Sequence, residues 1–344
     1  MSSVVAAATD ARTCQGAAFR PSLRPMLARL FPDRFVPVLL ATIVVASLLP
    51  VRGSAVPVAQ GISTAAIVLL FFLNGVRLPR QEVLHGIRNW KLQGGTFAFC
   101  FGAMALFGLG AQALTAPLLP PTLALGFLFL GILPSTVQSA TAASSMAGGN
   151  VAASIVAAAL LNLAGVFLSP LLFAALAGKA GAIHGAAALR IVAILLLPFL
   201  AGQTAQRWLR PLVLRHRGLA TLMDRTAIAT AVYVAFSAAV VGGIWTQLDG
   251  REIAIVLGVD ALLLGSAFGG AWLLGWLLAL RRSDRITLLF SGAQKSLAVG
   301  APLAATLFPS PIAGMVLLPI LVYHMAQLIL SAWIAPALAR HQEV

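Results

Sequence analysis

The stretch LLFSGAQKSLAVGAP, from Leu288 to Pro302, interrupts an apolar segment with a short run of polar and small residues. Its most costly member is Lys295, because a lysine at the centre of a bilayer costs about 2.5–3.5 kcal/mol on insertion scales. A chain that keeps a charge at this depth must recover the energy from a partner, a cavity or a function. We therefore expect the functional site to lie at this interruption, with the rest of the chain arranged around it.

The composition indicates the class of protein. Of the 344 residues, 60% are hydrophobic and only 9% are charged, and the mean hydropathy is +0.96. A soluble domain carries about 25% charged residues, which this chain lacks. In lipid every backbone group needs an internal partner, which leaves only helices or a closed barrel. The apolar segments do not alternate as barrel strands do, so we predict an all-α polytopic membrane protein.

The apolar residues fall into ten segments of a length that suits membrane-spanning helices. These predicted spans are Phe35 to Leu49, Pro57 to Val76, Leu92 to Leu114, Thr122 to Met146, Val151 to Leu176, Ala186 to Trp208, Thr226 to Trp245, Ile253 to Leu280, Ile286 to Phe308, and Ile312 to Leu338. Residues 1–30 precede them, with four arginines and one acid. A transit peptide has a similar composition, but we interpret these residues as a disordered, basic tail.

The basic residues support ten spans with both termini in the cytoplasm. With the N-terminus inside, eighteen Lys and Arg residues fall on the inner side, and only Arg52, Lys179, Arg190 and Arg251 on the outer side. This asymmetry is the positive-inside pattern of a protein in the inner (plasma) membrane of a cell. It also accounts for the net charge of +14 without a nucleic-acid partner. The expected partners are the lipid bilayer and a small-molecule solute, and the sequence does not predict an oligomeric state.

The fourth and ninth segments share one peculiarity, an interruption by polar and small residues. The fourth contains LPSTVQSATAASSMAGGN, from Leu133 to Asn150, and Gln138 aligns with Gln294 at an offset of 156 residues. We therefore predict two repeats of five helices, residues 31–177 and 186–340. Because five is odd, the second repeat is inverted, as in many secondary transporters. The alternative is two ordinary proline or glycine kinks.

Four motifs carry a resemblance to a known family. LFPDRF from Leu30, FFLNGVRL from Phe71, LPSTVQSA followed by GNVAASIVAA, and SGAQKSLAVGAPLAATLF from Ser291 resemble the bile acid:sodium symporter family, in particular a divergent branch of it. The resemblance covers about residues 27–340. It implies a panel domain of helices 1, 2, 6 and 7, and a core domain of helices 3–5 and 8–10. In that core the broken helices 4 and 9 cross.

The resemblance also implies a set of site residues. The family's helix-five hydroxyl corresponds to Ser154, its glutamine on helix nine to Gln294, and its Ser-Asn pair falls around Ser139 to Thr141. The sequence departs from the family where a sodium-binding glutamate is expected, because Phe290 stands there, and a cation follows Gln294. The candidate substrate- and ion-binding residues are Gln138, Ser139, Thr141, Ser154, Ser291, Gln294, Lys295 and Ser296.

Asp260 is the acid that lies inside an apolar segment, and it is the candidate charge partner of Lys295. A proton-relay pair and a static neutralising pair both remain open. If the two do not meet, we expect Lys295 to face a wet cavity that accepts anions. His324 and Asn162 are interpreted as interhelical hydrogen-bonding groups. The sequence shows no metal-ligand spacing and no cofactor motif, so the expected small ion is a coupling Na+ or H+.

These features predict a secondary active transporter, not an enzyme, that moves a small and probably anionic organic solute by alternating access. Two other interpretations compete with it. A membrane regulator or scaffold with a degenerate transporter fold would also lack the family's glutamate. An intramembrane enzyme could use a Ser-Lys dyad, because Ser139, Ser291 and Ser296 lie in the interrupted segments near Lys295.

Overall fold

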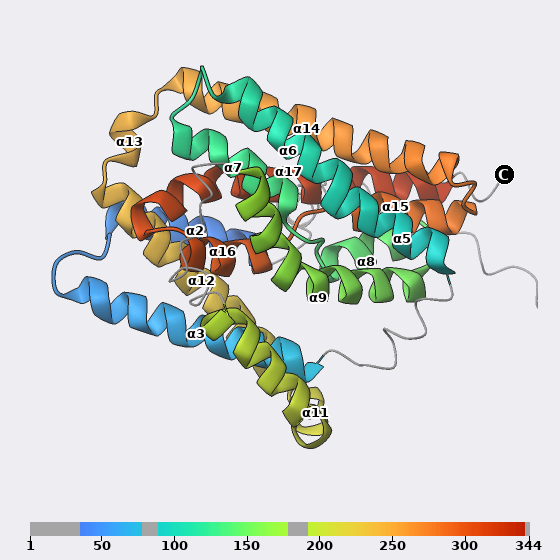
Figure 1. Cartoon of the computed structure of the whole chain (residues 1–344), viewed down its shortest axis with the longest axis horizontal. Coiled ribbons are helices and arrows are strands. Elements are labelled where there is room, and N and C mark those ends of the chain that lie inside the picture. The colour runs from blue at the N-terminus through green and yellow to red at the C-terminus, as the bar shows by residue number, and fades with distance from the viewer. Residues whose placement is uncertain (1–34, 78–88, 178–191, 341–344) are drawn as a thin grey trace, which may run out of the picture.

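The computed structural model describes residues 35–77, 89–177 and 192–340, and all regular structure in these ranges is helical (Figure 1). The all-α prediction is confirmed for this part of the chain. The predicted basic tail, residues 1–30, lies outside the described residues, as do residues 31–34 and 186–191 of the two predicted repeats.

The helices follow one another with short connections. They are α2 (Phe35–Leu48), α3 (Ala55–Arg77), α5 (Trp90–Ala98), the π-helical turn η2 (Phe99–Ala103), α6 (Met104–Thr115), α7 (Pro121–Ile132), α8 (Gln138–Met146), α9 (Val151–Leu176), the π-helical turn η4 (Val192–Leu196), α11 (Leu197–Arg215), α12 (Arg217–Val241), α13 (Ile244–Gln247), α14 (Gly250–Leu277), α15 (Arg282–Ala293), α16 (Leu297–Leu307) and α17 (Ser310–Arg340).

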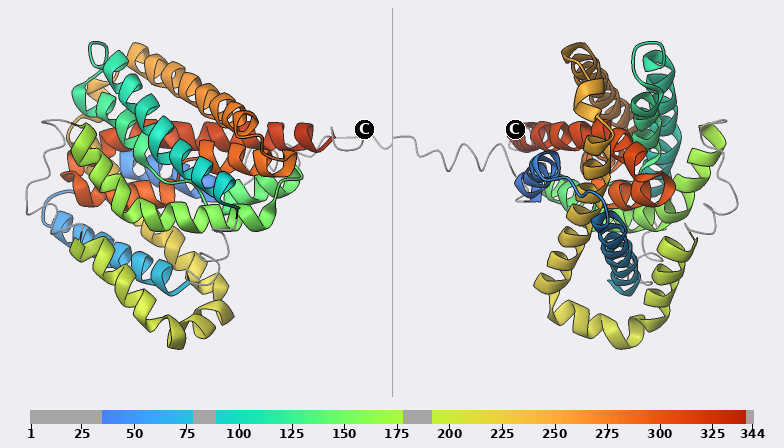
Figure 2. Two further views of the ribbon diagram at one scale, coloured as in Figure 1. Left: turned by 45° about the vertical axis from the view of Figure 1, so that its right-hand side comes forward. Right: turned by 90° about the vertical axis from the view of Figure 1, so that its left-hand side faces the viewer.

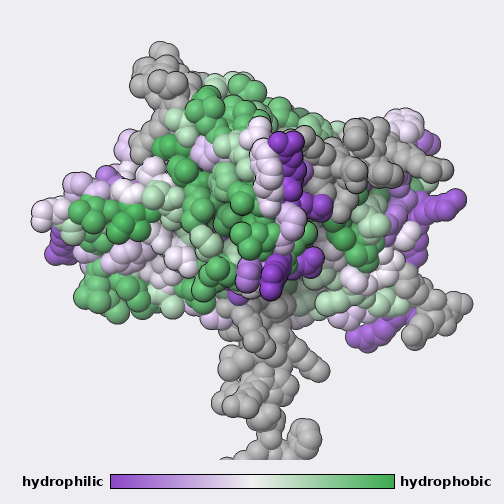
Figure 3. Space-filling view, turned by 90° about the horizontal axis from the view of Figure 1, so that it is seen from below, coloured by the Kyte–Doolittle hydropathy of each residue, from purple (hydrophilic) through white to green (hydrophobic). Residues whose placement is uncertain are grey.

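Six stretches among the described residues are long and apolar enough to cross a membrane: α3, the continuous run from Trp90 to Thr115, α9, α12, α14 and α17. Two shorter apolar helices, Pro37–Leu48 and Pro121–Ile132, accompany them. The chain is therefore an integral membrane protein with several apolar spans. Figure 3 agrees with this, because apolar residues cover much of the face shown and hydrophilic residues gather toward its ends and in one central cluster.

The predicted spans match the helices closely except around the sixth and seventh. The fifth predicted span coincides with α9, but α12 begins at Arg217, nine residues before the predicted start. Likewise α11 continues to Arg215, beyond the predicted end at Trp208. The physical reason is that arginine and leucine are good helix formers, so the chain stays helical after it leaves the apolar region.

Both predicted interruptions are breaks in the structure. The fourth segment divides into α7 and α8 with residues 133–137 between them, and the ninth divides into α15 and α16 with residues 294–296 between them. The first break, residues 133–137, begins at Leu133, which is extended because it precedes Pro134. The second break, residues 294–296, ends at Ser296, whose hydroxyl accepts a hydrogen bond from the Val299 N–H (3.3 Å). Across the two breaks, the Ser296 N–H donates to the Pro134 carbonyl (2.8 Å).

Helices α2, α3, α11 and α12 form one group on the side of the molecule opposite α14 and α6. Close backbone approach holds α3 against α11, because a side chain at Gly75 would overlap the Phe199 carbonyl and one at Gly202 would overlap the Phe72 carbonyl. Figure 2 shows α11 and α12 meeting at their inner ends as a hairpin that extends away from the other helices, with α3 between them. The other helices pack around the two breaks.

Candidate functional site

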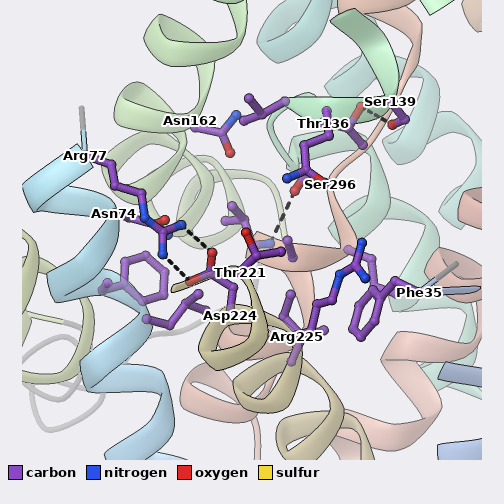
Figure 4. A pocket seen from close by; sticks show the side chains of 18 of the residues that line it. Phe35, Asn74, Arg77, Thr136, Ser139, Asn162, Thr221, Asp224, Arg225 and Ser296 are labelled. Carbon is purple, nitrogen blue, oxygen red and sulfur yellow. Dashed lines mark hydrogen bonds and ion pairs between the residues drawn. The ribbon is translucent and has the colours of Figure 1, made fainter. Parts of the chain in front are cut away.

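A cavity of about 390 Å³ lies between the α2, α3, α11 and α12 group and the two breaks. Its walls combine aromatic and aliphatic side chains with a small number of polar groups, as ligand-binding cavities usually do. The polar lining consists of Asn74, Arg77, Thr136, Gln138, Ser139, Asn162, Thr221, Asp224, Arg225, Ser296 and His324. Figure 4 shows ten of the lining residues converging from both sides of this space.

The N-termini of the two half-helices α8 and α16 border the cavity, because Gln138, Ser139, Leu297 and Ala298 line it. The third N–H of each helix has a side-chain acceptor: Ala140 donates to Thr136 Oγ1 (3.2 Å) and Val299 donates to Ser296 Oγ. The first two N–H groups of each helix have no partner among the described residues. Four unpaired donors and two helix dipoles therefore favour negative charge in the cavity.

Charged side chains line the opposite wall. Arg77 at the end of α3 forms a two-pronged ion pair with Asp224 of α12, in which Arg77 Nη2 lies 3.3 Å from Asp224 Oδ1 (Figure 4). The guanidinium of Arg225 lies over the ring of Phe35, with Cζ 5.5 Å from the centroid. The described charged residues that line the cavity are thus two arginines and one aspartate.

Lys295 lies beside the cavity and is not part of its lining. The side chain is fully buried, and its ammonium donates to the carbonyls of Cys100, Gly131 and Leu133 at 2.8 Å each. Cys100 belongs to the π-helical turn η2, and Gly131 and Leu133 to the end of α7. Such carbonyls have no partner within their own helix, so the ammonium satisfies orphan acceptors and opposes the negative end of the α7 dipole.

The predicted partnership of Lys295 with Asp260 is wrong. Asp260 is 1% exposed, and neither of its oxygens has a hydrogen-bond partner among the described residues. The expectation that an unpaired Lys295 would face an anion-accepting cavity is also wrong, because its three N–H bonds all go to carbonyls. Sequence reasoning considered carboxylates as counter-charges and overlooked the carbonyls that a helix break exposes.

The peptide of Lys295 is held by residues of α17. Gln327 accepts from the Lys295 N–H through Oε1 (2.7 Å) and donates to the Lys295 carbonyl through Nε2 (2.9 Å). His324 Nδ1 lies 2.8 Å from Gln327 Nε2. Tyr323 donates from its hydroxyl to the carbonyl of Ala293, the last residue of α15 (2.8 Å). Asn162, in turn, donates to the Ser135 carbonyl in the first break (3.0 Å). The predicted hydrogen-bonding roles of His324 and Asn162 are therefore observed, although both residues also line the cavity.

Three oxygens from the two broken helices form a closed triangle. Thr136 and Ser139 each donate to Gln294 Oε1, at 2.6 and 2.7 Å, and the two hydroxyls lie 2.7 Å apart. Gln294 Nε2 donates to Ser331 on α17 (2.9 Å). These oxygens satisfy one another and do not surround a shared space for an ion.

A second set of hydroxyls lies on α8, α9 and α15. Thr141 Oγ1 is 3.2 Å from Ser154 Oγ, which is 3.4 Å from Ser291 Oγ. All three groups are neutral, and Phe290 stands where the family resemblance implies a carboxylate. A sodium ion would meet no negative ligand among these candidates, so the residues present do not fit the family's sodium site.

The structure thus divides the predicted site residues. Gln138, Ser139 and Ser296 line the cavity; Gln294 and Lys295 are buried behind it, and Thr141, Ser154 and Ser291 form the separate hydroxyl set. Sequence reasoning missed Thr136, Arg77, Asp224 and Arg225. One signal was available, since Asp224 is an acid in an otherwise basic connection.

An integral membrane protein in which two broken helices meet beside a ligand-sized cavity has the organisation of a secondary transporter. The chain belongs to the SBF-like CPA transporter family, whose profile matches residues 33–340. Membership of a transporter family implies that the protein is not an enzyme.

Relatives of similar length occur in other bacteria. The chain is 37% identical over 317 residues to "Uncharacterized protein PA2026" of Pseudomonas aeruginosa, covering 92% of this chain and 95% of the relative. It is also 37% identical over 316 residues to "Putative symporter YfeH" of Escherichia coli (strain K12), covering 90% of this chain and 94% of the relative. A shorter similarity, 28% over 99 residues, relates it to "Uncharacterized protein YbaS" of Bacillus subtilis (strain 168), covering 29% of this chain and 31% of that one.

Proposed function

We propose that this chain is a secondary transporter that carries a small organic anion across the membrane by alternating access. The observation that carries the proposal is the meeting of two half-helix N-termini, those of α8 and α16, in one cavity. Their unpaired N–H groups form a ready site for a carboxylate, sulfonate or phosphate group. The symporter name of one relative supports coupled transport of a solute.

The remaining lining suits the organic part of such a solute. Phe35, Phe71 and Phe199 face the polar half-helix ends across the cavity, together with aliphatic residues such as Leu70 and Ile228. Burial of apolar surface against these side chains contributes affinity, while the N–H groups fix the orientation of the charged group. The role first assigned to Lys295, attraction of the anion, passes to the half-helix N-termini and to Arg225.

An inverted repeat of two five-helix units is part of the proposal, and the helix contacts support it. If α2 corresponds to α11 and α3 to α12, then the packing of α2 on α12 corresponds to that of α11 on α3, and both pairs are in contact. In the same way the contact of α6 with α7 matches that of α14 with α15, and α8 with α9 matches α16 with α17. Each proposed unit has its break at the fourth position.

In this scheme α2, α3, α11 and α12 form the panel, and the helices around the breaks form the core. The positive-inside pattern puts both termini and the hairpin of α11 and α12 on the cytoplasmic side of the inner membrane. The cavity borders the inner ends of α3 and α12, where Arg77 and Asp224 pair. The described conformation is then an inward-facing one, and transport moves the core against the panel.

A charge introduced into the cavity tests the anion proposal. Ala298 is exposed on the first turn of α16, where an aspartate suits the helix dipole but occupies the place proposed for the solute. Ala298→Asp should fold and lose anion binding about tenfold or more, and Ala298→Asn, of nearly the same shape, should retain it. The measurement is thermal stabilisation by a panel of carboxylates and sulfonates with the matching amides as neutral controls, followed by uptake in proteoliposomes. Equal stabilisation by the amides, or full anion binding by Ala298→Asp, contradicts the proposal.

The competing interpretations lead to different results. A regulator with a degenerate transporter fold binds a solute but shows no uptake in proteoliposomes. A Ser-Lys enzyme is not supported, since the Lys295 ammonium is bonded to three carbonyls and to none of Ser139, Ser291 and Ser296. A lysine in that arrangement has no lone pair directed at a hydroxyl.

A further inference from the structure

His324 on α17 connects the cavity to the second break. The ring lines the cavity, and its Nδ1 lies 2.8 Å from Gln327 Nε2 and 3.3 Å from the Lys295 carbonyl oxygen. Gln327 is fully buried and holds the N–H and the carbonyl of the Lys295 peptide at once. A solute or proton that reaches the cavity therefore lies one side chain away from the group that holds the break.

The hydrogen-bond partners fix the protonation of this network. The Lys295 backbone N–H is a donor, so the Gln327 atom that it meets is Oε1, and Nε2 lies on the other side. The two hydrogens of Nε2 go to the Lys295 carbonyl and to His324 Nδ1. His324 Nδ1 must then accept, which places the proton of the neutral ring on Nε2.

Protonation of His324 removes this acceptor. An imidazolium carries hydrogens on both nitrogens, so Nδ1–H would point at the Nε2–H of Gln327, and two donors at 2.8 Å repel each other. The other acceptor close to Nδ1 is the Lys295 carbonyl, which Gln327 now occupies. A protonated His324 competes for that carbonyl and displaces Gln327 from the Lys295 peptide.

We propose that His324 is a proton-binding site, and that binding a proton there releases Gln327 and loosens the break between α15 and α16. Imidazole is the side chain that changes charge between about pH 5 and 8, so the release occurs within the range that a bacterial cell meets. The consequence for transport rests on the proposed function: the proton bound at His324 is the ion to which solute movement is coupled. The candidates for a sodium site offer no negative ligand, which agrees with coupling to a proton.

The charged groups around His324 come from several elements. Across the cavity lie Arg77 of α3 and the adjacent Asp224 and Arg225 of α12, and Tyr233 is farther along α12. The Lys295 ammonium is turned toward Cys100, Gly131 and Leu133, and Asp260 is buried on α14. Helices α7, α8 and α16 contribute no titratable side chain. On α17 itself, Tyr323 is bonded to the Ala293 carbonyl.

The first test is the tautomer of His324 in the full chain. A variant in which the other four histidines are replaced by asparagine leaves one ring to observe by NMR, with ¹⁵N-labelled histidine in detergent micelles. At high pH the ring should carry its proton on Nε2, and it should titrate to imidazolium as the pH falls toward about 5. A neutral ring protonated on Nδ1, or a ring that does not titrate between about pH 5 and 8, overturns the proposal.

The second test measures the break. Hydrogen exchange of the Lys295 amide, followed by mass spectrometry and corrected for the intrinsic pH dependence, should lose about tenfold protection on acidification, as expected when one hydrogen bond is lost. His324→Asn keeps an acceptor but cannot bind a proton, so its protection should not change with pH. His216→Asn, an exposed control outside the cavity, should behave as the wild type does. A His324→Asn variant with the wild-type pH profile refutes the inference, whereas a normal switch in a protein without uptake refutes the transport function alone.

Discussion

The two helix breaks differ in what holds them. In the first break and the last turn before it, each carbonyl from Gly131 to Ser135 receives a donor from elsewhere in the chain. Lys295 serves Gly131 and Leu133, Ser169 serves Ile132, the Ser296 N–H serves Pro134, and Asn162 serves Ser135. In the second break, Gln327 and Tyr323 of α17 supply neutral groups.

The difference shows that the breaks are not equivalent. A charge from the second break stabilises the first, whereas neutral amide and hydroxyl groups stabilise the second. Charge-assisted hydrogen bonds are stronger than neutral ones, so the first break is the more rigid of the two. The second break is held by groups that a single proton can rearrange. We expect movement during transport to begin there, and the following predictions test this asymmetry.

The largest effect is expected for Lys295→Met. The substitution leaves the carbonyls of Cys100, Gly131 and Leu133 buried without this donor, at a cost of about 1–3 kcal/mol each. Thermal unfolding followed by size-exclusion chromatography should show a loss of several kcal/mol or no folded protein. Lys91→Met, at an exposed position on α5, is the matched control and should be nearly neutral. If both variants unfold at the same temperature as the wild type, the first break does not depend on the ammonium.

A second comparison sets Gln327→Leu against Asn162→Leu. Gln327 serves both polar groups of the Lys295 peptide, while Asn162 serves one carbonyl of the first break and the Ala158 carbonyl of its own helix. With about 1–3 kcal/mol for each buried group left unpaired, Gln327→Leu should cost more. Hydrogen exchange should rise around residues 294–296 in the first variant and around residues 133–137 in the second. Equal and diffuse exchange in both would mean that the breaks do not open separately.

Asp260→Leu asks whether Lys295 has a hidden counter-charge. The Asp260 oxygens have no partner among the described residues, so a leucine of similar volume should leave the stability unchanged or raise it by about 1–4 kcal/mol. Asp260→Asn, which keeps the shape and a polar amide, is the control. A loss of stability as large as that of Lys295→Met would show that the two charges depend on each other after all.

The smallest effects are expected at the two half-helix caps. Ser296→Ala removes the acceptor for Val299 N–H, and Thr136→Val removes the acceptor for Ala140 N–H. Each should cost about 1 kcal/mol in thermal unfolding, which is the usual contribution of an N-cap side chain. Thr136→Val should cost somewhat more, because it also breaks the bond to Gln294 Oε1. Thr221→Val, on the opposite wall and bonded to the carbonyl one turn back, is the control.

Much of the fold could be predicted because it depends on local chemistry. The composition and the lengths of the apolar segments led to helices, and α9 ends where its apolar run ends. Pro134 and the polar run at Ser291 to Ser296 located both breaks, since proline and unpaired polar residues disrupt a helix in any surroundings. The family could be recognised from motifs at these same places, and the profile match confirms it.

The pairing of groups across the molecule could not be predicted in this way. The sequence determined that a lysine lies inside the membrane, and that it must have a partner. Only the tertiary structure decided that the partner is a set of carbonyls from η2 and α7 in place of Asp260, because a free carbonyl exists only where helices end or bulge. It likewise decided that the cavity belongs to Gln138, Ser139 and Ser296 with Arg77 and Asp224, since these residues are distant in the chain and meet only when the helices pack.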